Sequence, residues 1–267
     1  MKSGVKALIF DVDGTLSETE EVHRLAFNRA FEMSGLDWDW DQELYSKLLV
    51  VPGGQSRLEY YLDTFDPADV GGLKARLPEV HRIKSHVYAK MIDQRLARLR
   101  PGVERLIDEA HSRGIQVVLA TTSSIDNAEA LIISNLELSG LEKISFIAGG
   151  DEVKTKKPSP EIYEMVLKRL KIPARNCLVF EDSENGLKAA MAAGLRTIVT
   201  PSTYSRGGDF SGAFAVLSSL GDAFDPYEHF SGAGDGETMV TVSALRRWVA
   251  DDDDIRSLLT IGGKSLF

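Results

Sequence analysis

The sequence predicts an α/β protein whose core is a doubly wound parallel sheet that carries an inserted all-helical cap domain. Short apolar runs alternate with segments of helical periodicity over most of the chain, which is the pattern of a parallel sheet covered by helices. The alternation stops between residues 20 and 99, where the pattern is helical almost throughout. We therefore expect a core domain of residues 1–19 and 100–267 and a cap domain of residues 20–99.

The core strands are expected at apolar runs that are too short for a typical helix, several of them rich in Val and Ile. They are Ala7–Phe10, Ile115–Ala120, Ile144–Ala148, Leu178–Phe180 and Thr197–Val199. The helices expected between them are Val103–Ser112, Asn127–Asn135, Pro160–Leu170 and Glu184–Ala193. Pro160 suits a first helical turn, and Gly194 suits a position just beyond a helix end.

Four helices are expected in the cap, at Glu21–Ser34, Gln42–Leu49, Ser56–Thr64 and Pro78–Leu99. Trp38 and Trp40 are expected to pack in the cap interior. Arg100-Pro101-Gly102 is a turn signal that marks the return to the core. After Asp225 the sequence predicts no helix or strand clearly. Gly232–Gly236 predicts a flexible stretch, and the acidic run Asp251–Asp254 is typical of a solvated surface.

Composition and charge exclude several classes of protein. With 267 residues, 43% hydrophobic and 27% charged, the chain has the make-up of an ordinary globular protein. A formal net charge of −9 argues against general binding to nucleic acid or to an anionic membrane. The single cysteine, Cys177, cannot form an internal disulfide and is expected inside a strand, which fits a reducing compartment.

No apolar run approaches the roughly 20 residues of a membrane span, and no secretory signal precedes the first predicted strand. We expect a cytoplasmic protein, or a plastid stromal one if a transit peptide has been removed. We expect it to be a monomer or a weak oligomer.

Two aspartates and a glycine follow the first predicted strand, in the sequence Phe10-Asp11-Val12-Asp13-Gly14-Thr15. Alternate side chains of an extended backbone share a side, so Asp11 and Asp13 can converge at the carboxyl end of the strand. Open α/β sheets bind their ligands at that end. Gly14 permits a sharp turn that leaves backbone amides able to approach an anion. A plain Asp-Gly turn is the alternative interpretation.

Two further polar motifs suit a phosphate. Thr121 and Thr122 end the second predicted strand, where a hydroxyl can donate to a phosphate oxygen; a loop that favours Thr and Ser is the alternative. Lys156-Lys157-Pro158-Ser159-Pro160 precedes a helix. A lysine held there by two prolines can neutralise phosphate charge, and a solvated lysine pair is the alternative.

Two carboxylates, Glu181 and Asp182, follow the predicted strand that ends at Phe180. Magnesium prefers hard oxygen ligands, commonly one or two carboxylates with water and substrate phosphate. Asp182 can therefore share a metal ion with Asp11. Asp182 or Ser183 can also cap the following helix, and both interpretations can hold for different residues.

The motifs follow one another in a specific order, Asp-x-Asp-Gly-Thr, then Thr, then Lys-Pro, then Glu-Asp, with each motif at a predicted strand end. In this order, over residues 6–201, the chain resembles the haloacid dehalogenase (HAD) superfamily. The helical insert soon after the first motif resembles the C1-type cap. The resemblance implies a Rossmann-like core and a magnesium-dependent phosphatase that forms an aspartyl-phosphate.

The resemblance also implies a role for each motif residue. Asp11 is expected to be the nucleophile and Asp13 the general acid/base. The residues expected to bind the transferring phosphoryl group are Thr121, Thr122 and Lys157. Mg²⁺ is expected on Asp11, on Asp182 and on the backbone carbonyl of Asp13, with Glu181 as a second or water-mediated ligand. Such positive charge would offset the repulsion between an attacking carboxylate and a phosphate dianion.

Segments of the predicted cap have a second resemblance, to the CbbY-type xylulose-1,5-bisphosphate phosphatases. The segments are Glu18–His23, Leu36–Asp41, Gly53–Arg57 and His81–Lys84. This resemblance implies a small sugar bisphosphate as substrate. The substrate-facing residues that it implies are Glu20, His23, Tyr45, Arg57 and Lys84. His81 or Arg82 can face the site in place of Lys84.

A plainer interpretation exists for several of these residues. His23 and Arg57 can lie on an exposed helix surface. Tyr45 can belong to the cap interior, and Glu20 can complement a helix dipole.

Two other functions stay open. β-Phosphoglucomutase shares the motifs and the cap type, but there a basic residue and an asparagine are expected where this chain has Ser124 and Ile125. A catalytically inactive binding protein on the same fold is the alternative from another class. The presence of both Asp11 and Asp13 argues against it.

Overall fold

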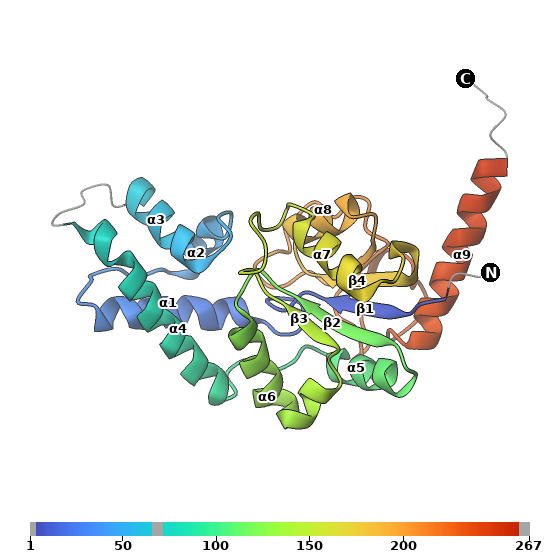
Figure 1. The fold of residues 1–267 in the computed structure, drawn as a ribbon, viewed down its shortest axis with the longest axis horizontal. Helices are drawn as coiled ribbons and strands as arrows, with labels where there is room; N and C mark the ends of the chain where they lie inside the picture. Colours follow the sequence, from blue (N-terminus) through green and yellow to red (C-terminus); the bar gives the residue numbers. More distant parts are fainter. Residues whose placement is uncertain (1–3, 66–71, 262–267) are drawn as a thin grey trace, which may run out of the picture.

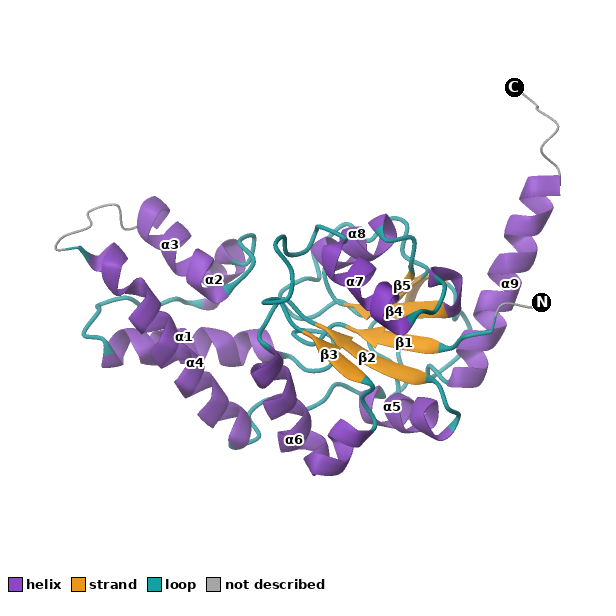
Figure 2. Ribbon diagram, viewed as in Figure 1, coloured by secondary structure: helices purple, strands orange, loops and turns teal. Residues whose placement is uncertain are grey.

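The computed structural model describes residues 4–65 and 72–261. A central sheet lies between two layers of helices, and a group of four helices lies to one side of this core (Figure 1, Figure 2). The strand order is β3-β2-β1-β4-β5-β6-β7. β1 to β6 run parallel, and β7 pairs antiparallel with β6.

The strands are β1 Ala7–Phe10, β2 Gln116–Ala120, β3 Phe146–Ala148, β4 Cys177–Glu181, β5 Arg196–Val199, β6 Ala215–Leu217 and β7 His229–Gly232. The core helices are α5 Val103–Ser112, α6 Ile125–Glu142, α7 Glu161–Leu170, α8 Glu184–Ala192 and α9 Val242–Ile261, with the 3₁₀ turn η2 Ala174–Asn176. The other helices are α1 Thr19–Met33, α2 Gln42–Leu48, α3 Gly54–Phe65 and α4 Leu77–Asp93, with the 3₁₀ turn η1 Leu73–Arg76.

Helices cover both faces of the sheet, as a doubly wound fold requires. On β1, Leu8 and Phe10 face a core shared with α5, α6 and α9, whereas Ala7 and Ile9 face a core shared with α7 and α8. Burial on both faces explains why the parallel strands read as continuous apolar runs. The predicted fold class is confirmed, and the buried Cys177 lies at the start of β4 as expected.

β1 is the point at which the strand order reverses, because β2 and β3 lie on one side of it and β4 and β5 on the other. The loops that follow β1, β2 and β4 therefore leave the same edge of the sheet side by side. In open α/β sheets, a ligand site forms in the crevice at such a switch point.

Helices α1 to α4 share a hydrophobic cluster that is separate from the sheet cores. Trp40 and Phe31 are fully buried in it, and Trp38 packs at its margin, as expected for the cap interior. α4 also packs against α6, which joins this group to the core. α1 begins at Thr19, one residue before the boundary that we propose for the cap. Residues 66–71 of that cap and residues 262–267 of the core lie outside the described residues.

Two helix ends differ from the prediction. α4 ends at Asp93 and not at Leu99, and Arg95 just beyond it has a φ of 59°, in the left-handed region that commonly ends helices. α6 continues to Glu142 and not Asn135, across an irregular residue at Glu137 with a φ of 60°.

The region after residue 200 differs most. β6, β7 and α9 are absent from the predicted elements. Gly232 ends β7, and Gly234 packs so closely that an added Cβ would lie 2.8 Å from the Trp248 ring, so the prediction of a flexible stretch is wrong for these residues. The acidic run belongs to α9. Asp251 and Asp254 are exposed as predicted, whereas Asp252 accepts from Arg196 Nε at 2.8 Å and Asp253 pairs with the same guanidinium. Both differences come from contacts with distant parts of the chain. No helix within the described ranges is long and apolar enough to cross a membrane.

Candidate active site

Asp11 leaves the end of β1 and lies at the centre of the crevice. Its side chain is 6% exposed. Lys157 Nζ donates to Asp11 Oδ1 at 2.6 Å, and Thr15 Oγ1 donates to Asp11 Oδ2 at 3.1 Å. Burial raises the pKa of Asp11 well above its usual value, although Lys157 opposes this effect.

Lys157 donates hydrogen bonds at the ends of three strands. Its ammonium also donates to the Ala120 carbonyl at 3.0 Å and to Glu181 Oε1 at 2.6 Å, so it bridges β1, β2 and β4. Burial alone would disfavour the ammonium, but Asp11 and Glu181 outweigh it and raise the pKa of Lys157 well above its usual value. Lys157 therefore carries a fixed positive charge beside Asp11.

Glu181 is fully buried at the end of β4. Its Oε1 accepts from Lys157 and from the Tyr163 hydroxyl of α7. A Cβ on Gly186, in the first turn of α8, would lie 1.8 Å from Glu181 Oε2. Only a glycine at this position leaves room for the carboxylate.

Asp182 is held by the loop that follows β5. Ser202 Oγ donates to Asp182 Oδ2 at 2.5 Å, and Ser205 Oγ donates to the Asp182 carbonyl at 2.7 Å. Gly14, with a φ of +86°, lets the first loop come close, since a Cβ there would lie 2.3 Å from Asp182 Oδ2. Burial and then Glu181 raise the pKa of Asp182 to about 7. Ser183, and not Asp182, caps α8, because its hydroxyl accepts from the Gly186 amide.

The carboxylates of Asp11, Glu181 and Asp182 each offer an oxygen within 4.8 Å of the others. Three buried carboxylates at such distances repel one another, and that repulsion adds to the raised pKa values of Asp11 and Asp182. A divalent cation would remove this cost, and a set of hard oxygens is what Mg²⁺ prefers. The residues present therefore fit a magnesium ion.

Asp13 lies beside Asp11 but points toward the helices of the proposed cap. Its Oδ1 accepts from Thr19 Oγ1 at 2.6 Å and lies 3.2 Å from His23 Nε2. Burial raises the pKa of Asp13, but the hydrogen bond and charge of His23, the Thr19 hydroxyl and Lys84 outweigh it and lower the pKa to about 2. Burial lowers the pKa of His23 itself, so a neutral ring can act on Asp13 as a hydrogen-bond donor.

His23 connects Asp13 to Lys84 of α4. Lys84 Nζ lies 2.7 Å from His23 Nδ1, so a neutral ring can accept from Lys84 and donate from Nε2 to Asp13. Burial lowers the pKa of Lys84 to about 7. Arg82 points away and pairs with Glu79 on the exposed face of α4. Of the three candidates in this segment, Lys84 is the one that the structure brings to Asp13.

Glu20, Tyr45 and Arg57 form a second group. The Tyr45 hydroxyl donates to Glu20 Oε2 at 2.8 Å and accepts from Arg57 Nη1 at 3.0 Å. Arg57 is 7% exposed, so it does not lie on an exposed helix surface. Tyr45 is fully buried in the cluster around Trp40, as expected for the cap interior, and it reaches the cavities through its contacts with Glu20 and Arg57.

Thr121 and Thr122 occupy different positions. Thr121 is fully buried; its Oγ1 accepts from the Ser123 amide at 2.9 Å and lies 3.4 Å from Asp13 Oδ2. Thr122 lines the cavities, and its carbonyl accepts from Lys156 Nζ at 3.1 Å.

Two adjoining cavities lie between the sheet edge and the proposed cap. The larger, of about 470 Å³, holds Asp11, Lys157 and Asp182; the smaller, of about 260 Å³, holds Lys84, His81 and Lys156. Both are lined by Asp13, Glu20, Gly53, Arg57 and Thr122.

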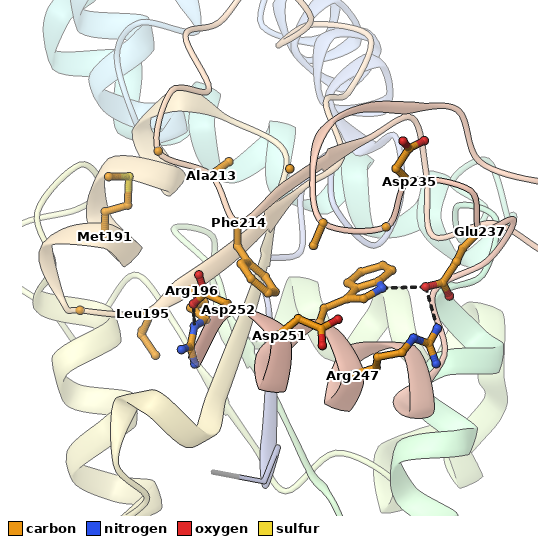
Figure 3. A pocket seen from close by; sticks show the side chains of 16 residues that line it. Met191, Leu195, Arg196, Ala213, Phe214, Asp235, Glu237, Arg247, Asp251 and Asp252 are labelled. Atoms are coloured by element: carbon orange, nitrogen blue, oxygen red, sulfur yellow. Dashed lines mark hydrogen bonds and ion pairs between the residues drawn. The ribbon is translucent and has the colours of Figure 1, made fainter. Parts of the chain in front are cut away.

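A still larger cavity, of about 820 Å³, lies elsewhere, at the amino end of β5. Figure 3 shows its lining, in which Trp248 and Arg247 both donate to Glu237. It contains none of the motif residues, so its size does not make it the active site.

Several residues of the site are not predicted by the sequence patterns. Ser202 and Ser205 are among them, although Ser202 follows the fifth predicted strand, and the rule that polar residues gather at strand ends could have found it. Tyr163 and Tyr204 carry no such signal, because they come from a helix interior and from a loop. Tyr204 contacts Glu21 and packs edge-on against Tyr45 at 5.7 Å.

A buried carboxylate held against a lysine, at the carboxyl edge of a parallel sheet and beside further carboxylates, is suited to attack on phosphorus. The profile of the haloacid dehalogenase-like hydrolases matches residues 5–194. Protein CbbY of Cupriavidus necator is 43% identical over 247 residues, which cover 91% of this chain and 96% of that protein. The chain therefore belongs to the haloacid dehalogenase-like hydrolases.

Solved structures agree with this assignment. A CbbY variant from Rhodobacter sphaeroides in complex with xylulose 1,5-bisphosphate is 42% identical, with a TM-score of 0.75 over 80% of this chain and 94% of that one. β-Phosphoglucomutase from Clostridium difficile is 25% identical, with a TM-score of 0.66 over 80% of this chain and 91% of that one. The chain is more similar to the CbbY protein than to this mutase.

Proposed function

We propose that this chain is a magnesium-dependent phosphatase that hydrolyses a sugar bisphosphate, such as xylulose 1,5-bisphosphate, through an aspartyl-phosphate on Asp11. One observation carries the proposal: Asp11 is buried against Lys157, within one cavity that also holds Asp182 and reaches Arg57. The similarity to a CbbY protein that binds xylulose 1,5-bisphosphate supports the choice of sugar. We place the activity in the cytoplasm, or in the plastid stroma if a transit peptide has been removed.

In the first step, an oxygen of Asp11 forms a bond to phosphorus while the bond to the sugar oxygen breaks. Lys157 opposes the repulsion between the carboxylate and the phosphate oxygens. Magnesium held by Asp11, Asp182 and the Asp13 carbonyl, with Glu181 as a further or water-mediated ligand, would add positive charge at the same phosphate. Thr122 lines both cavities and the Thr121 hydroxyl lies 3.4 Å from Asp13 Oδ2, which supports a role for both residues beside the phosphoryl group.

Asp13 moves the proton in both steps. It donates to the leaving sugar oxygen and then removes a proton from the water that attacks the acyl phosphate. Its carboxylate form, favoured by Thr19 and His23, suits the second step directly. In the first step, the negative charge of a bound phosphate raises the pKa of Asp13 and favours the protonated acid.

The test is phosphate release from xylulose 1,5-bisphosphate, from sugar monophosphates and from p-nitrophenyl phosphate, with and without Mg²⁺. We expect the bisphosphate to have the highest kcat/KM and chelation to abolish turnover reversibly. Asp11→Asn should remove all turnover, because an amide neither attacks phosphorus well nor anchors a metal ion. Metal-independent turnover, or undiminished activity in Asp11→Asn, would contradict the mechanism.

A mutase would behave differently in one further assay. Given β-glucose 1-phosphate and its bisphosphate, it would form glucose 6-phosphate with little release of phosphate. Our proposal expects release of phosphate and no isomer.

A further inference from the structure

The smaller of the two cavities is lined by three cations, Arg57, Lys84 and Lys156, and by the carboxylates of Asp13, Glu20 and Asp151. The N-terminal ends of α3 and α6 also line it, through Gly53 and Gly54 on one side and Ser123 and Ser124 on the other. Helix N-termini carry partial positive charge and free amide groups, which favour anions. Because the cavity shares Arg57 and Asp13 with the larger one, a single small molecule can reach from one into the other.

Two buried cations face this cavity without a carboxylate partner in an ion pair. Arg57 is 7% exposed and donates only to the Tyr45 hydroxyl and the Leu48 carbonyl among the described residues. Lys84 is 5% exposed and contacts His23. Burial of a cation without an ion-pair partner is costly, and burial lowers the pKa of Lys84 even though the charges of Asp13 and Glu20 oppose this effect. The cost falls when an anion enters the cavity.

Lys156 is the cation that the core contributes. It is half-buried, its Nζ donates to the Thr122 carbonyl, and no carboxylate of the described residues forms an ion pair with it. A Cβ on Gly53 would lie 3.0 Å from Lys156 Nζ, so the ammonium reaches across from the loop before α7 to the start of α3. Lys157, its neighbour, points into the larger cavity and is used by Asp11 and Glu181.

We propose that Lys156 binds the second phosphoryl group of the substrate in the smaller cavity, together with Arg57, and that it selects bisphosphates over monophosphates. This inference rests on the proposed bisphosphatase function. The two adjacent lysines then have different roles: Lys157 binds the phosphoryl group that reacts, and Lys156 binds the phosphoryl group that does not react. Asp13, Glu20 and Asp151 also line this cavity and repel an anion, so we expect the phosphoryl group to lie on the side of Lys156 and Arg57.

The test compares kcat/KM for xylulose 1,5-bisphosphate and for p-nitrophenyl phosphate, which has no second phosphate. Lys156→Gln should lose at least about tenfold on the bisphosphate, the size expected for a charge-assisted hydrogen bond, and a much smaller factor on the ester. Lys156→Arg should retain most of the selectivity. The matched control is Lys154→Gln, an exposed lysine of the same loop, which should leave both values unchanged.

Binding in the Asp11→Asn background provides a second readout. There Lys156→Gln should raise the Kd for the bisphosphate far more than the Kd for inorganic phosphate. Equal proportional losses on both substrates, or no loss on either, would overturn the role of Lys156 while leaving a wild-type preference for the bisphosphate intact. A wild-type preference for monophosphates would overturn the proposed substrate and this inference together.

Discussion

At the scale of single residues, the site separates two aspartates that lie two positions apart. Asp11 is surrounded by Lys157, Glu181 and Asp182, and burial raises its pKa. Asp13 accepts from Thr19 and His23, and its pKa is lowered to about 2. Groups of one chemical type whose environments move their pKa values in opposite directions are the usual basis for different roles in one mechanism.

Asp13→Asn should lower kcat by at least about 10²-fold, the lower end for positioned proton transfer. KM should change less, because the amide is similar in shape and can still bind near Thr19. Steady-state kinetics with a sugar phosphate, which has a poor leaving group, provide the measurement. A near-native rate on that substrate would show that Asp13 is not the acid.

The lowered pKa of Lys84 leads to a prediction about the pH dependence of kcat/KM. Burial and then Arg57 lower its pKa to about 7, against the opposing effect of Asp13 and Glu20. Lys84 is a cation below that pH and an amine above it, so kcat/KM for an anion held by Lys84 should fall as pH rises through about 7. The profile should be measured in wild type and in Lys84→Met. The variant should have lower efficiency and no such decline; a decline that persists in it would assign the effect to another group.

At the scale of elements, the two ends of the sheet have different roles: the carboxyl end holds the candidate active site, and the amino end packs against α9. Loops after β1 to β5 form the site: Lys157, after β3, donates to the ends of β1, β2 and β4, and Ser202, after β5, donates to Asp182, after β4. At the opposite end, α9 closes the sheet core through Trp248 and Leu245, and Arg196 at the start of β5 binds α9 through Asp252 and Asp253. α9 therefore contributes to stability and not to the reaction.

Trp248→Ala should lower the free energy of unfolding by about 3–5 kcal/mol, the usual cost of removing a large buried ring. Trp248 is 5% exposed, and its Nε1 donates to Glu237 at 2.8 Å. Urea unfolding measures the loss, and kcat of the folded fraction should stay native. The matched control is Arg247→Gln, which removes an exposed partner of the same Glu237 and should cost less than about 1 kcal/mol. Equal effects of the two substitutions would contradict the role of the ring.

At the scale of the whole molecule, a chain with a net charge of −9 gathers cations where the proposed cap meets the core. Arg57 and Lys84 come from the cap side, and Lys156 and Lys157 come from the core. Closure of the cap over a bound substrate would exclude water and bring both sets onto it. Binding energy from a remote phosphate would then raise the rate as well as the affinity.

Arg57→Ala tests this arrangement. It should depress kcat/KM for a sugar bisphosphate far more than for p-nitrophenyl phosphate, because guanidinium binds phosphate in a bidentate manner and the small ester does not reach it. The two efficiencies should be measured in wild type and variant. Equal proportional losses would show that Arg57 supports the fold of the cap and makes no contact with the substrate.

The sequence by itself determined the sheet, its five central strands and the group of motif residues. Buried parallel strands leave continuous apolar runs, and polar residues placed directly after such runs must meet at one edge of the sheet. Local order along the chain was therefore enough to bring together Asp11, Asp13 and Asp182, whereas Lys157 was identified by the Lys-Pro motif that precedes α7.

Only the tertiary structure decided what depends on contacts between distant segments. It places Lys84, and not Arg82, beside His23. It brings Ser202 and Ser205 into hydrogen-bonding contact with Asp182, and it pairs Asp252 of the acidic run with Arg196. It also placed Lys156 against Gly53. None of these pairs is separated by a helical or strand period, so no local pattern records them; they arise because the folded sheet and the proposed cap bring their surfaces into contact.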